Sequence, residues 1–163
     1  MPVPEFVVEL RRKIGQDLLW IPGVTAVVFD ADDRVLLVRR ADTGEWAPIG
    51  GILEPGEQPA VCAAREVLEE SGVHVRVQRL VAVQSEPPGA YPNGDRVQFL
   101  DLSFRCLYVS GDPHPADDEC LDVAWFELDE LPPMRPLWLA RLLAAVPVDA
   151  PVAYDLPEDG FAQ

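Results

Sequence analysis

The sequence predicts an α/β fold of the α+β type, in which helices cover both faces of a mixed central sheet. Two observations lead to this class. Strand-like runs of alternating apolar and polar residues lie on both sides of a central helical pattern at 57–71. A second helical pattern, at 136–146, follows the last strand-like run. Because the 163 residues contain no internal repeat and no long linker, we expect a single domain over 1–163.

The N-terminal part predicts a short helix followed by a β-hairpin. Residues 5–14 place apolar side chains at helical spacing with basic residues between them, which is typical of an amphipathic helix. The β-rich runs 23–30 and 34–40 flank the polar turn Ala-Asp-Asp, and this arrangement indicates a hairpin. Residues 41–57 are dense in glycine and proline, so we expect a loop with one short strand at 51–53.

The central helix, 57–71, is followed by Gly72, which is placed to cap its C-terminus. Apolar residues recur along it at helical spacing, and we expect this face to pack against the sheet: Val61, Ala64 and Leu68. The opposite face is then expected to carry only carboxylates, with Arg65 at its margin.

Three carboxylates gather where the helix is least favourable to them. Glu66, Glu69 and Glu70 stand at i, i+3 and i+4 and repel one another, and the negative end of the helix dipole disfavours anions in the last turn. A bound cation would reverse this balance. Mg²⁺ usually takes one or two carboxylates, several waters and the phosphate oxygens of a substrate. The alternative is an acidic face exposed to water.

The C-terminal part adds three strands and the closing helix. Alternating patterns cover 73–86 and 95–111, with an Asn-Gly turn dipeptide just before the second, and a further strand is expected at 121–128. The acidic, proline-rich tail 147–163 is expected to lie on the surface or to be disordered. The core of the domain is therefore expected to span about 23–146.

The formal net charge of −15 at pH 7 restricts the partners of the protein. Nucleic-acid backbones and anionic membranes attract basic patches, so we expect neither as the main partner. A small molecule that bears phosphate stays compatible, because a bound metal supplies positive charge. The N-terminus has no signal-peptide pattern and no apolar run is long enough to span a membrane, so we expect a cytoplasmic protein.

The central helix belongs to a longer spaced motif. Gly51, five residues, Glu57, seven residues and then 65–73 match G-x5-E-x7-R-E-U-x-E-E-x-G-U, with U aliphatic, at every specified position. The chain therefore resembles the Nudix hydrolase family over roughly 23–131, and in particular a bacterial subgroup described as ADP-ribose pyrophosphatase-like or MutT-like. The resemblance implies a Nudix-type α/β/α sandwich with a mixed central sheet, in which the motif forms a loop–helix–loop.

The resemblance also implies a divalent-metal site, with Mg²⁺ favoured and Mn²⁺ as the second choice. The groups implied as ligands are the backbone carbonyl of Gly50 and the carboxylates of Glu66, Glu69 and Glu70. Glu57 and Arg65 are implied to orient these carboxylates by hydrogen bonding. One departure concerns the preceding loop, where Ile49 separates Pro48 from the glycine pair and is expected to alter the neighbouring pocket wall.

Two positions remain open for the catalytic base, because members of the family differ in its location. Glu66 is the candidate on the helix. Glu119, in the segment Ala-Asp-Asp-Glu-Cys before the last strand, is the candidate on a later loop. For the acidic residues of this loop the alternative is a turn exposed to water.

The reaction implied is attack of water on the diphosphate of a nucleoside diphosphate linked to a second group, with an ADP-ribose-like substrate favoured. The alternatives are pyrophosphohydrolysis of nucleoside triphosphates, including oxidised deoxynucleotides, and a non-catalytic nucleotide-binding regulator on the same fold. The candidate substrate-binding residues are Trp46, Glu86, Tyr91, Asp95 and Arg96. Core packing is the alternative for Trp46, and a well-formed hairpin turn is the alternative for Asp95.

The amphipathic N-terminal segment and the apolar run Asp-Leu-Leu-Trp-Ile-Pro-Gly, residues 17–23, suggest a homodimer contact. Internal packing of the same residues is the alternative.

Overall fold

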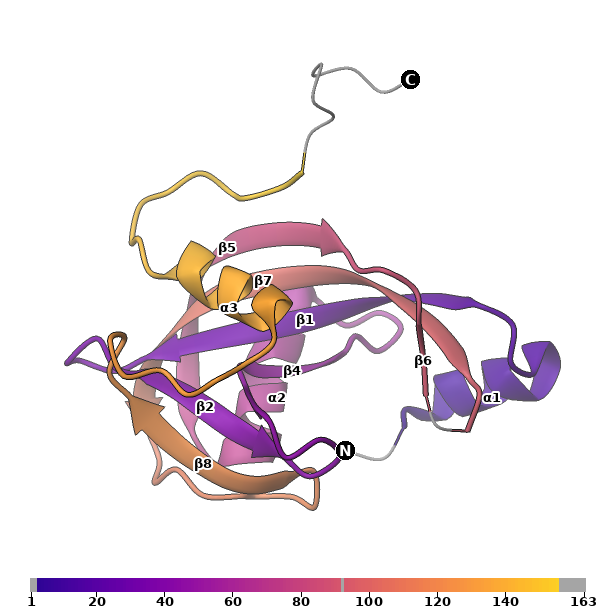
Figure 1. The fold of residues 1–163 in the computed structure, drawn as a ribbon, viewed down its shortest axis with the longest axis horizontal. Coiled ribbons are helices and arrows are strands. Elements are labelled where there is room, and N and C mark those ends of the chain that lie inside the picture. The colour runs from indigo at the N-terminus through magenta and orange to yellow at the C-terminus, as the bar shows by residue number, and fades with distance from the viewer. Residues whose placement is uncertain (1–2, 92, 156–163) are drawn as a thin grey trace.

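The computed structural model describes residues 3–91 and 93–155 (Figure 1). In chain order its helices and strands are α1 (Glu5–Ile14), β1 (Leu19–Phe29), β2 (Val35–Arg40), β3 (Trp46–Ala47), β4 (Ile49–Ile52), α2 (Pro59–Ser71), β5 (His74–Ser85), β6 (Gly89–Ala90), β7 (Arg96–Ser110), β8 (Cys120–Phe126) and α3 (Pro136–Ala145).

The strands form one mixed sheet with β1 at its centre. The strand order is β3-β2-β1-β7-β5, and β4, β6 and β8 pair with β1, β7 and β2, respectively. β1 and β7 run parallel along their length, from the pair Leu19–Val97 to the pair Phe29–Leu107. The other strand pairs are antiparallel. The predicted mixed sheet is confirmed.

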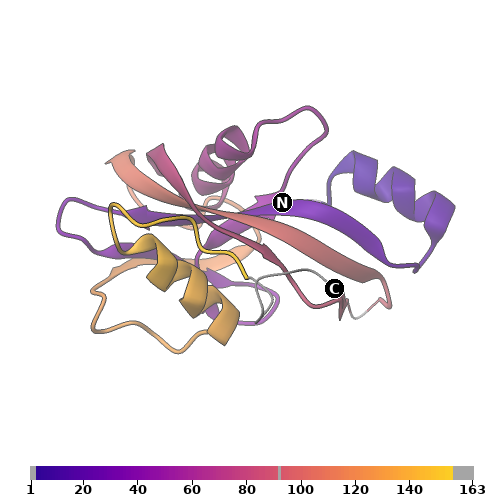
Figure 2. The same ribbon diagram turned by 90° about the horizontal axis from the view of Figure 1, so that it is seen from above.

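Helices α2 and α3 cover opposite faces of this sheet (Figure 2). The side chains of β1 alternate between the two layers, because successive residues of a strand point to opposite faces. Val24, Ala26 and Val28 belong to the apolar cluster on the α2 side, whereas Val27 and Phe29 belong to the cluster on the α3 side. This burial on both faces explains the nearly continuous apolar run of β1 and confirms the α/β/α sandwich.

Helix α1 covers the projecting ends of β1 and β7, at the right of Figure 1. Its bounds are those predicted from the sequence. Val7 is buried in a third apolar cluster with Leu19, Ile21 and Val97. Arg11 fastens the helix, since its guanidinium donates to the carbonyl of Arg96 at 2.6 Å. The helix is therefore docked on the sheet through an apolar face and a hydrogen-bonded arginine.

The run 17–23 divides between the interior and the surface. Leu19 and Ile21 are buried under α1, whereas Leu18 and Trp20 are exposed. Internal packing thus accounts for Leu19 and Ile21 but not for Leu18 and Trp20. The homodimer contact stays a prediction.

Strand β1 begins at Leu19, before the predicted start at 23. The sequence hides these residues because Pro22 and Gly23 interrupt the pattern. Proline fits here because the pairing with β4 begins only at Gly23, so the missing N–H of Pro22 costs no bond on that side. The predicted short strand at 51–53 is β4, shifted toward the N-terminus.

The predicted packing face of the central helix is wrong. Val61 and Leu68 are 59% and 40% exposed, respectively. The inward face of α2 carries Cys62, Ala63, Glu66, Val67, Glu70 and Ser71. Two of the carboxylates therefore point into the protein, where burial makes them costly unless they are paired.

The tail lies on the surface as far as the structure describes it. Ala153 forms a parallel bridge with Ala82 of β5, and Arg79 donates to the carbonyl of Pro147 at 2.6 Å. The rest of the predicted tail, from 156, lies outside the described residues. None of the described helices is long and apolar enough to cross a membrane.

Candidate active site

Arg65 holds the charged side chains of α2 and the loop before it together. Its guanidinium forms a bidentate pair with Glu57, from Nε to Oε1 and from Nη2 to Oε2, at 2.9 Å each. Its Nη1 donates to Glu66 Oε1 at 2.9 Å and to Glu69 Oε2 at 3.1 Å. The hydrogen bonds from Arg65 to Glu57 lower the pKa of Glu57 to about 2. The geometry supports an orienting role for Glu57 and Arg65, because a bidentate pair fixes both partners.

The Glu66 carboxylate lies against the glycine pair of β4. Only 1% of Glu66 is exposed. A Cβ atom at Gly51 would overlap this carboxylate, and one at Gly50 would lie 2.8 Å from the carbonyl oxygen of Val24. Glycine at both positions therefore lets β4 lie close to α2 on one side and to β1 on the other.

Glu70 is buried one turn after Glu66. It is 5% exposed, and the thiol of Cys120 donates to its Oε2 over 3.5 Å. Burial raises the pKa of Glu66 to about 7 and that of Glu70 to about 8, and the neighbouring Glu66 charge adds to the shift at Glu70. Two carboxylates that resist ionisation in this way are suited to a cation, which stabilises their charged forms.

These residues fit a metal that is bound together with its substrate. Within the described residues, no group of three or more His, Cys, Asp or Glu side chains is placed to hold an ion. The donors available are the two buried carboxylates and the carbonyl of Gly50. An all-oxygen set of this size suits Mg²⁺, which keeps several waters and takes phosphate oxygens as further ligands.

Glu69 differs from the two buried carboxylates in its exposure. Its side chain is 42% exposed and is paired with Arg65. It lines a groove on the outer side of α2 together with Leu68, not the cleft beside Glu66. Glu69 is thus joined to Glu66 through Arg65 Nη1, but it does not share the burial of Glu66 and Glu70, and its role as a metal ligand stays a prediction.

A cleft of about 690 Å³ opens beside Glu66. Residues from four segments line this end of it: Arg40, Gly50, Gly51, Glu66 and Glu119. The loop that carries Glu119 is fastened to the end of β2, because the backbone N–H of Ala41 donates to the Glu119 carbonyl at 2.7 Å. Both candidate bases, Glu66 and Glu119, thus belong to one cleft.

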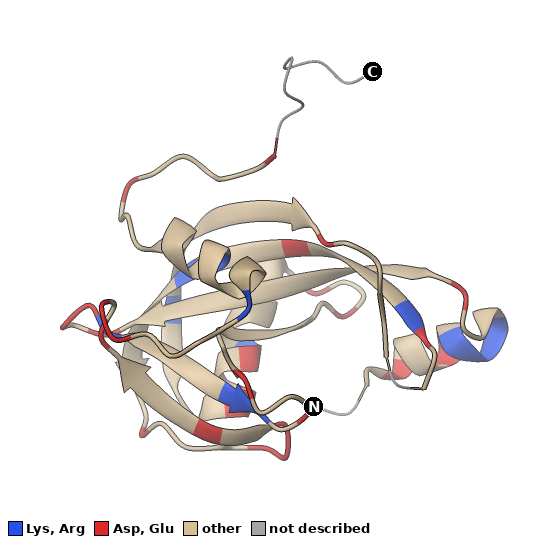
Figure 3. Ribbon diagram, viewed as in Figure 1, with Lys and Arg blue, Asp and Glu red and all other residues tan. Residues whose placement is uncertain are grey.

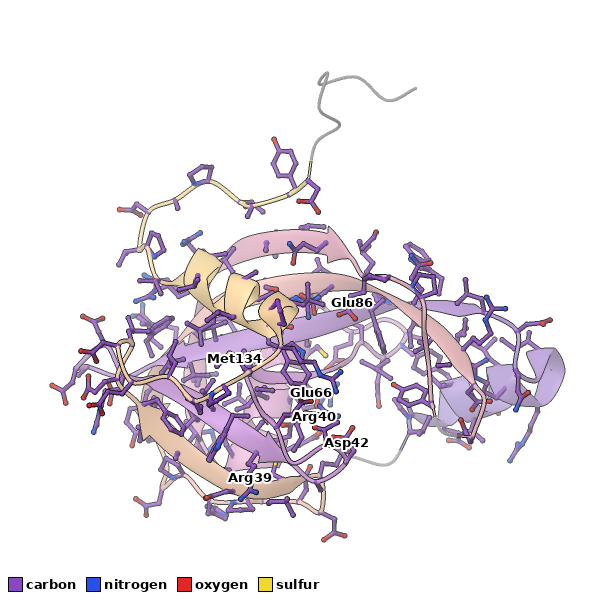
Figure 4. The ribbon with its side chains drawn as sticks, in the orientation of Figure 1. Arg39, Arg40, Asp42, Glu66, Glu86 and Met134 are labelled. Atoms are coloured by element: carbon purple, nitrogen blue, oxygen red, sulfur yellow. The ribbon has the colours of Figure 1, made fainter. Side chains whose placement is uncertain are left out.

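Arg40 is a site residue that the sequence reasoning missed. It ends β2 and lines the cleft with Glu66, and both side chains are labelled in Figure 4. Asp42 binds the Arg40 guanidinium with both oxygens, at 2.9 and 2.8 Å, and raises its pKa. The available clue was its position, at the end of a buried strand and just before the motif loop.

Two of the candidate substrate residues, Tyr91 and Asp95, line the same cleft. Asp95 also belongs to the hairpin turn, where its backbone N–H donates to Asn93 Oδ1 at 3.1 Å. The hairpin-turn interpretation of Asp95 is therefore confirmed, and its role in substrate binding stays a prediction.

The other three candidates lie elsewhere. Trp46 packs edge-on against Phe126 in the apolar cluster on the α3 side, which favours the core interpretation. Glu86 accepts a hydrogen bond from Arg141 Nη2 at 2.7 Å and lines a smaller recess that shares Tyr91 and Val97 with the cleft. Arg96 is exposed and contributes its carbonyl to Arg11.

A buried polar network under β1 was also missed. Asp101 accepts hydrogen bonds from Thr25 at 2.7 Å and from Ser103 at 2.6 Å, and it pairs with Arg141 of α3 at 3.3 Å. Thr25 is the register partner of Gly50, so the network supports β1 directly beneath the glycine pair. Nothing in the local sequence indicates it, because its members are scattered over three elements.

A model of the NUDIX domain matches residues 19–146, and the chain belongs to this family. A MutT-like protein of Streptomyces ambofaciens is 38% identical over 125 residues, which cover 76% of this chain and 75% of that protein. NAD-capped RNA hydrolase NudC of Pseudomonas aeruginosa is 38% identical over 110 residues. These cover 66% of this chain but only 37% of NudC, so the similarity spans little more than a third of that protein.

Among solved structures, an ADP-ribose pyrophosphatase of Streptococcus suis matches with a TM-score of 0.61 at 25% identity, covering 77% of this chain and 89% of that one. The predicted Nudix fold and the predicted hydrolase class are confirmed, and divalent metal ions are general in the family.

Proposed function

We propose that this protein hydrolyses a nucleoside diphosphate linked to a second group, with ADP-ribose as the favoured type of substrate. The observation that carries the proposal is the single cleft in which Glu66, Gly50 and the Arg40 guanidinium meet. The cleft thus combines oxygen donors for Mg²⁺ with the fixed positive charge of Arg40, and both stabilise a bound diphosphate. The named activity of the Streptococcus suis structure supports the choice of substrate.

Each residue has a defined task in the proposed reaction. Glu66, Glu70 and the Gly50 carbonyl would hold the divalent ion, which when bound stabilises phosphate charge and acidifies water. Arg40 binds a phosphate oxygen, and Asp42 keeps its guanidinium in place. Glu119 removes a proton from the attacking water, while the bond from phosphorus to the bridging oxygen breaks. The products are a nucleoside monophosphate and the phosphorylated second group.

The choice of Glu119 over Glu66 as the base follows from the contacts of Glu66. Glu66 accepts from Arg65 and is one of two buried donors for the metal. We expect Glu119→Gln to lower kcat by a hundredfold or more, about the contribution of a general base, while metal affinity is retained. Glu66→Gln should instead lose metal affinity. Steady-state kinetics with calorimetric titration of Mn²⁺ separate the two effects, and normal turnover in Glu119→Gln would exclude it as the base.

A substrate panel tests the proposal itself. The protein is incubated with Mg²⁺ or Mn²⁺ and with ADP-ribose, NADH, NAD-capped RNA, sugar nucleotides or nucleoside triphosphates, and the released phosphates are identified. We expect AMP and ribose 5-phosphate from ADP-ribose. Turnover of NAD-capped RNA would contradict the expectation that nucleic acid is not a partner.

Nucleoside triphosphate pyrophosphohydrolysis is the second candidate, supported by the similarity to the MutT-like protein. It predicts release of inorganic pyrophosphate from triphosphates and no turnover of ADP-ribose.

A further inference from the structure

The two ends of the cleft differ in origin. The end that carries Arg40, Glu66 and Glu119 falls within the family match, which begins at residue 19. The other end is walled by Val7 and Val8 of α1, which precede that match. Part of the wall at this end is therefore built from a helix outside the part of the chain that defines the family.

This second end is apolar and firmly built. Val7, Leu19, Ile21 and Val97 line it, and each is less than a tenth exposed. Arg11 holds α1 in place through the carbonyls of Asp17 at 2.7 Å and Arg96 at 2.6 Å. Basic residues also gather in the last turn of α1, as Figure 3 shows, so the helix contributes positive charge to an acidic molecule.

Polar groups are present at only a few points of this end. Tyr91 presents a half-exposed aromatic ring, and burial raises the pKa of its hydroxyl, so the ring stays neutral. The Asp95 carboxylate accepts a hydrogen bond from Asn93 Nδ2 at 2.9 Å and pairs with Arg11 Nε at 3.8 Å, and its other lone pairs can accept from a ligand. An apolar recess with one aromatic ring and a few acceptors is typical of a pocket for a small ligand.

We infer that α1 and Tyr91 form the binding pocket for the flat heteroaromatic base of the substrate. The inference rests on the proposed function, because a diphosphate bound at Glu66 and Arg40 places the rest of the substrate near α1. A base has apolar faces, which suit the valine and isoleucine walls, and it stacks on an aromatic ring. Its ring-edge amino groups donate to acceptors such as Asp95.

Val8→Trp tests the role of the helix. Val8 lines the cleft and is 38% exposed, so a tryptophan there fits sterically and projects over the pocket. Val109→Trp, at a 59% exposed position of β7 that does not line the cleft, is the matched control. The substrates are ADP-ribose and 5-phosphoribosyl 1-diphosphate, which carries a diphosphate but no base.

We expect Val8→Trp to raise KM for ADP-ribose about tenfold, because the larger side chain takes the space of the base and displaces it from the Tyr91 ring. Its kcat, and its KM for the substrate without a base, should stay within about twofold of the control. Tyr91→Leu should reproduce this split, whereas Tyr91→Phe, which keeps the ring, should not. An equal rise in KM for both substrates, or an unchanged KM for ADP-ribose in both Val8→Trp and Tyr91→Leu, overturns the inference. The proposed function is not affected by either outcome.

If neither substrate is turned over, binding of AMP tests whether α1 and Tyr91 form a pocket for the base. Calorimetry measures the affinity of AMP for the wild type, the control and Val8→Trp. Loss of about tenfold affinity in Val8→Trp alone supports the pocket even though the proposed function has failed. No binding of AMP, or equal binding by all three proteins, overturns the inference.

Discussion

At the scale of single residues, the position of the Glu66 carboxylate depends on Gly51, because glycine has no side chain. Gly51 has no positive φ angle, so its backbone does not require glycine. The reason for glycine is space, because a Cβ atom there would overlap the Glu66 carboxylate. The motif shows that position 51 is glycine, but only the structure shows which group occupies the space.

Gly51→Ala should therefore displace Glu66 and weaken metal binding. We expect the affinity for Mn²⁺ to fall by about tenfold or more, as for the loss of other groups that position metal ligands. Calorimetric titration measures the effect. Gly89→Ala is the matched control, since a Cβ atom there meets only an ordinary contact with the Val97 carbonyl. Unchanged affinity in Gly51→Ala would show that Glu66 does not bind the metal.

The raised pKa values of Glu66 and Glu70 predict how the metal-free protein responds to pH. In the folded state these values are about 7 and about 8, against 4.5 for an ordinary glutamate. The folded protein thus binds more protons than the unfolded chain between these limits, and the free energy of unfolding falls as pH rises through 7 and 8. In a chelating buffer, we expect a lower melting temperature at about pH 9 than at about pH 6.

Two additions check the cause of that fall. Mn²⁺ at the higher pH should recover the lost melting temperature, because it binds the ionised carboxylates. Glu70→Gln, which has no charge to bury, should show a weaker dependence on pH in chelator. A variant that depends on pH as strongly as the wild type would assign the fall to other groups.

At the scale of the elements, α2 shows where sequence reasoning succeeds and where it fails. The helix itself follows from its periodicity and from Gly72, which adopts a left-handed conformation with φ of 69° at its C-terminus. Its orientation does not follow, because the apolar periodicity marks Val61 and Leu68, both exposed. The inward face includes Glu66 and Glu70, and a pattern rule that assigns charge to the surface places them outside.

Helix α2 is joined to the preceding loop through Glu57, and this link can be weakened without touching the buried carboxylates. Glu57→Gln removes the charge of a bidentate pair that is only partly exposed. We expect a loss of about 1–2 kcal/mol in the free energy of unfolding at neutral pH, measured by urea denaturation.

The pKa of about 2 at Glu57 sets the pH range of this effect. The contribution is present above the ordinary value of 4.5 and is lost as pH falls toward 2, so wild type and variant should converge in acid. A difference in stability that persists at low pH would point to packing, not charge.

At the scale of the whole molecule, the net charge of −15 opposes an anionic substrate. Salt screens this repulsion over a distance of about 10 Å at 0.1 M. We therefore expect kcat/KM for ADP-ribose, at saturating metal, to rise by about twofold between about 20 and about 200 mM NaCl. If a basic surface directed binding, kcat/KM would fall as salt rises. Such a fall would mean that the cations of the cleft dominate the approach of the substrate.

The global arrangement was the least predictable part of the fold. Each element except the very short strands follows from local periodicity, and α1 has its predicted bounds. The parallel pair of β1 and β7 does not, because it joins residues far apart in the sequence. The same limit applies to the cleft. Arg40 and the valines of α1 reach the cleft only through tertiary contacts, whereas the motif is contiguous.

The central place of β1 has a consequence for synthesis of the chain. The motif, 51–73, is synthesised completely before β7. Yet β4, which carries its glycine pair, is supported by β1, and β1 completes its pairing only with β7. Strand pairs of such long sequence separation form late and slowly. A nascent chain that ends at the motif therefore has every residue of the predicted metal site but lacks the sheet that arranges them.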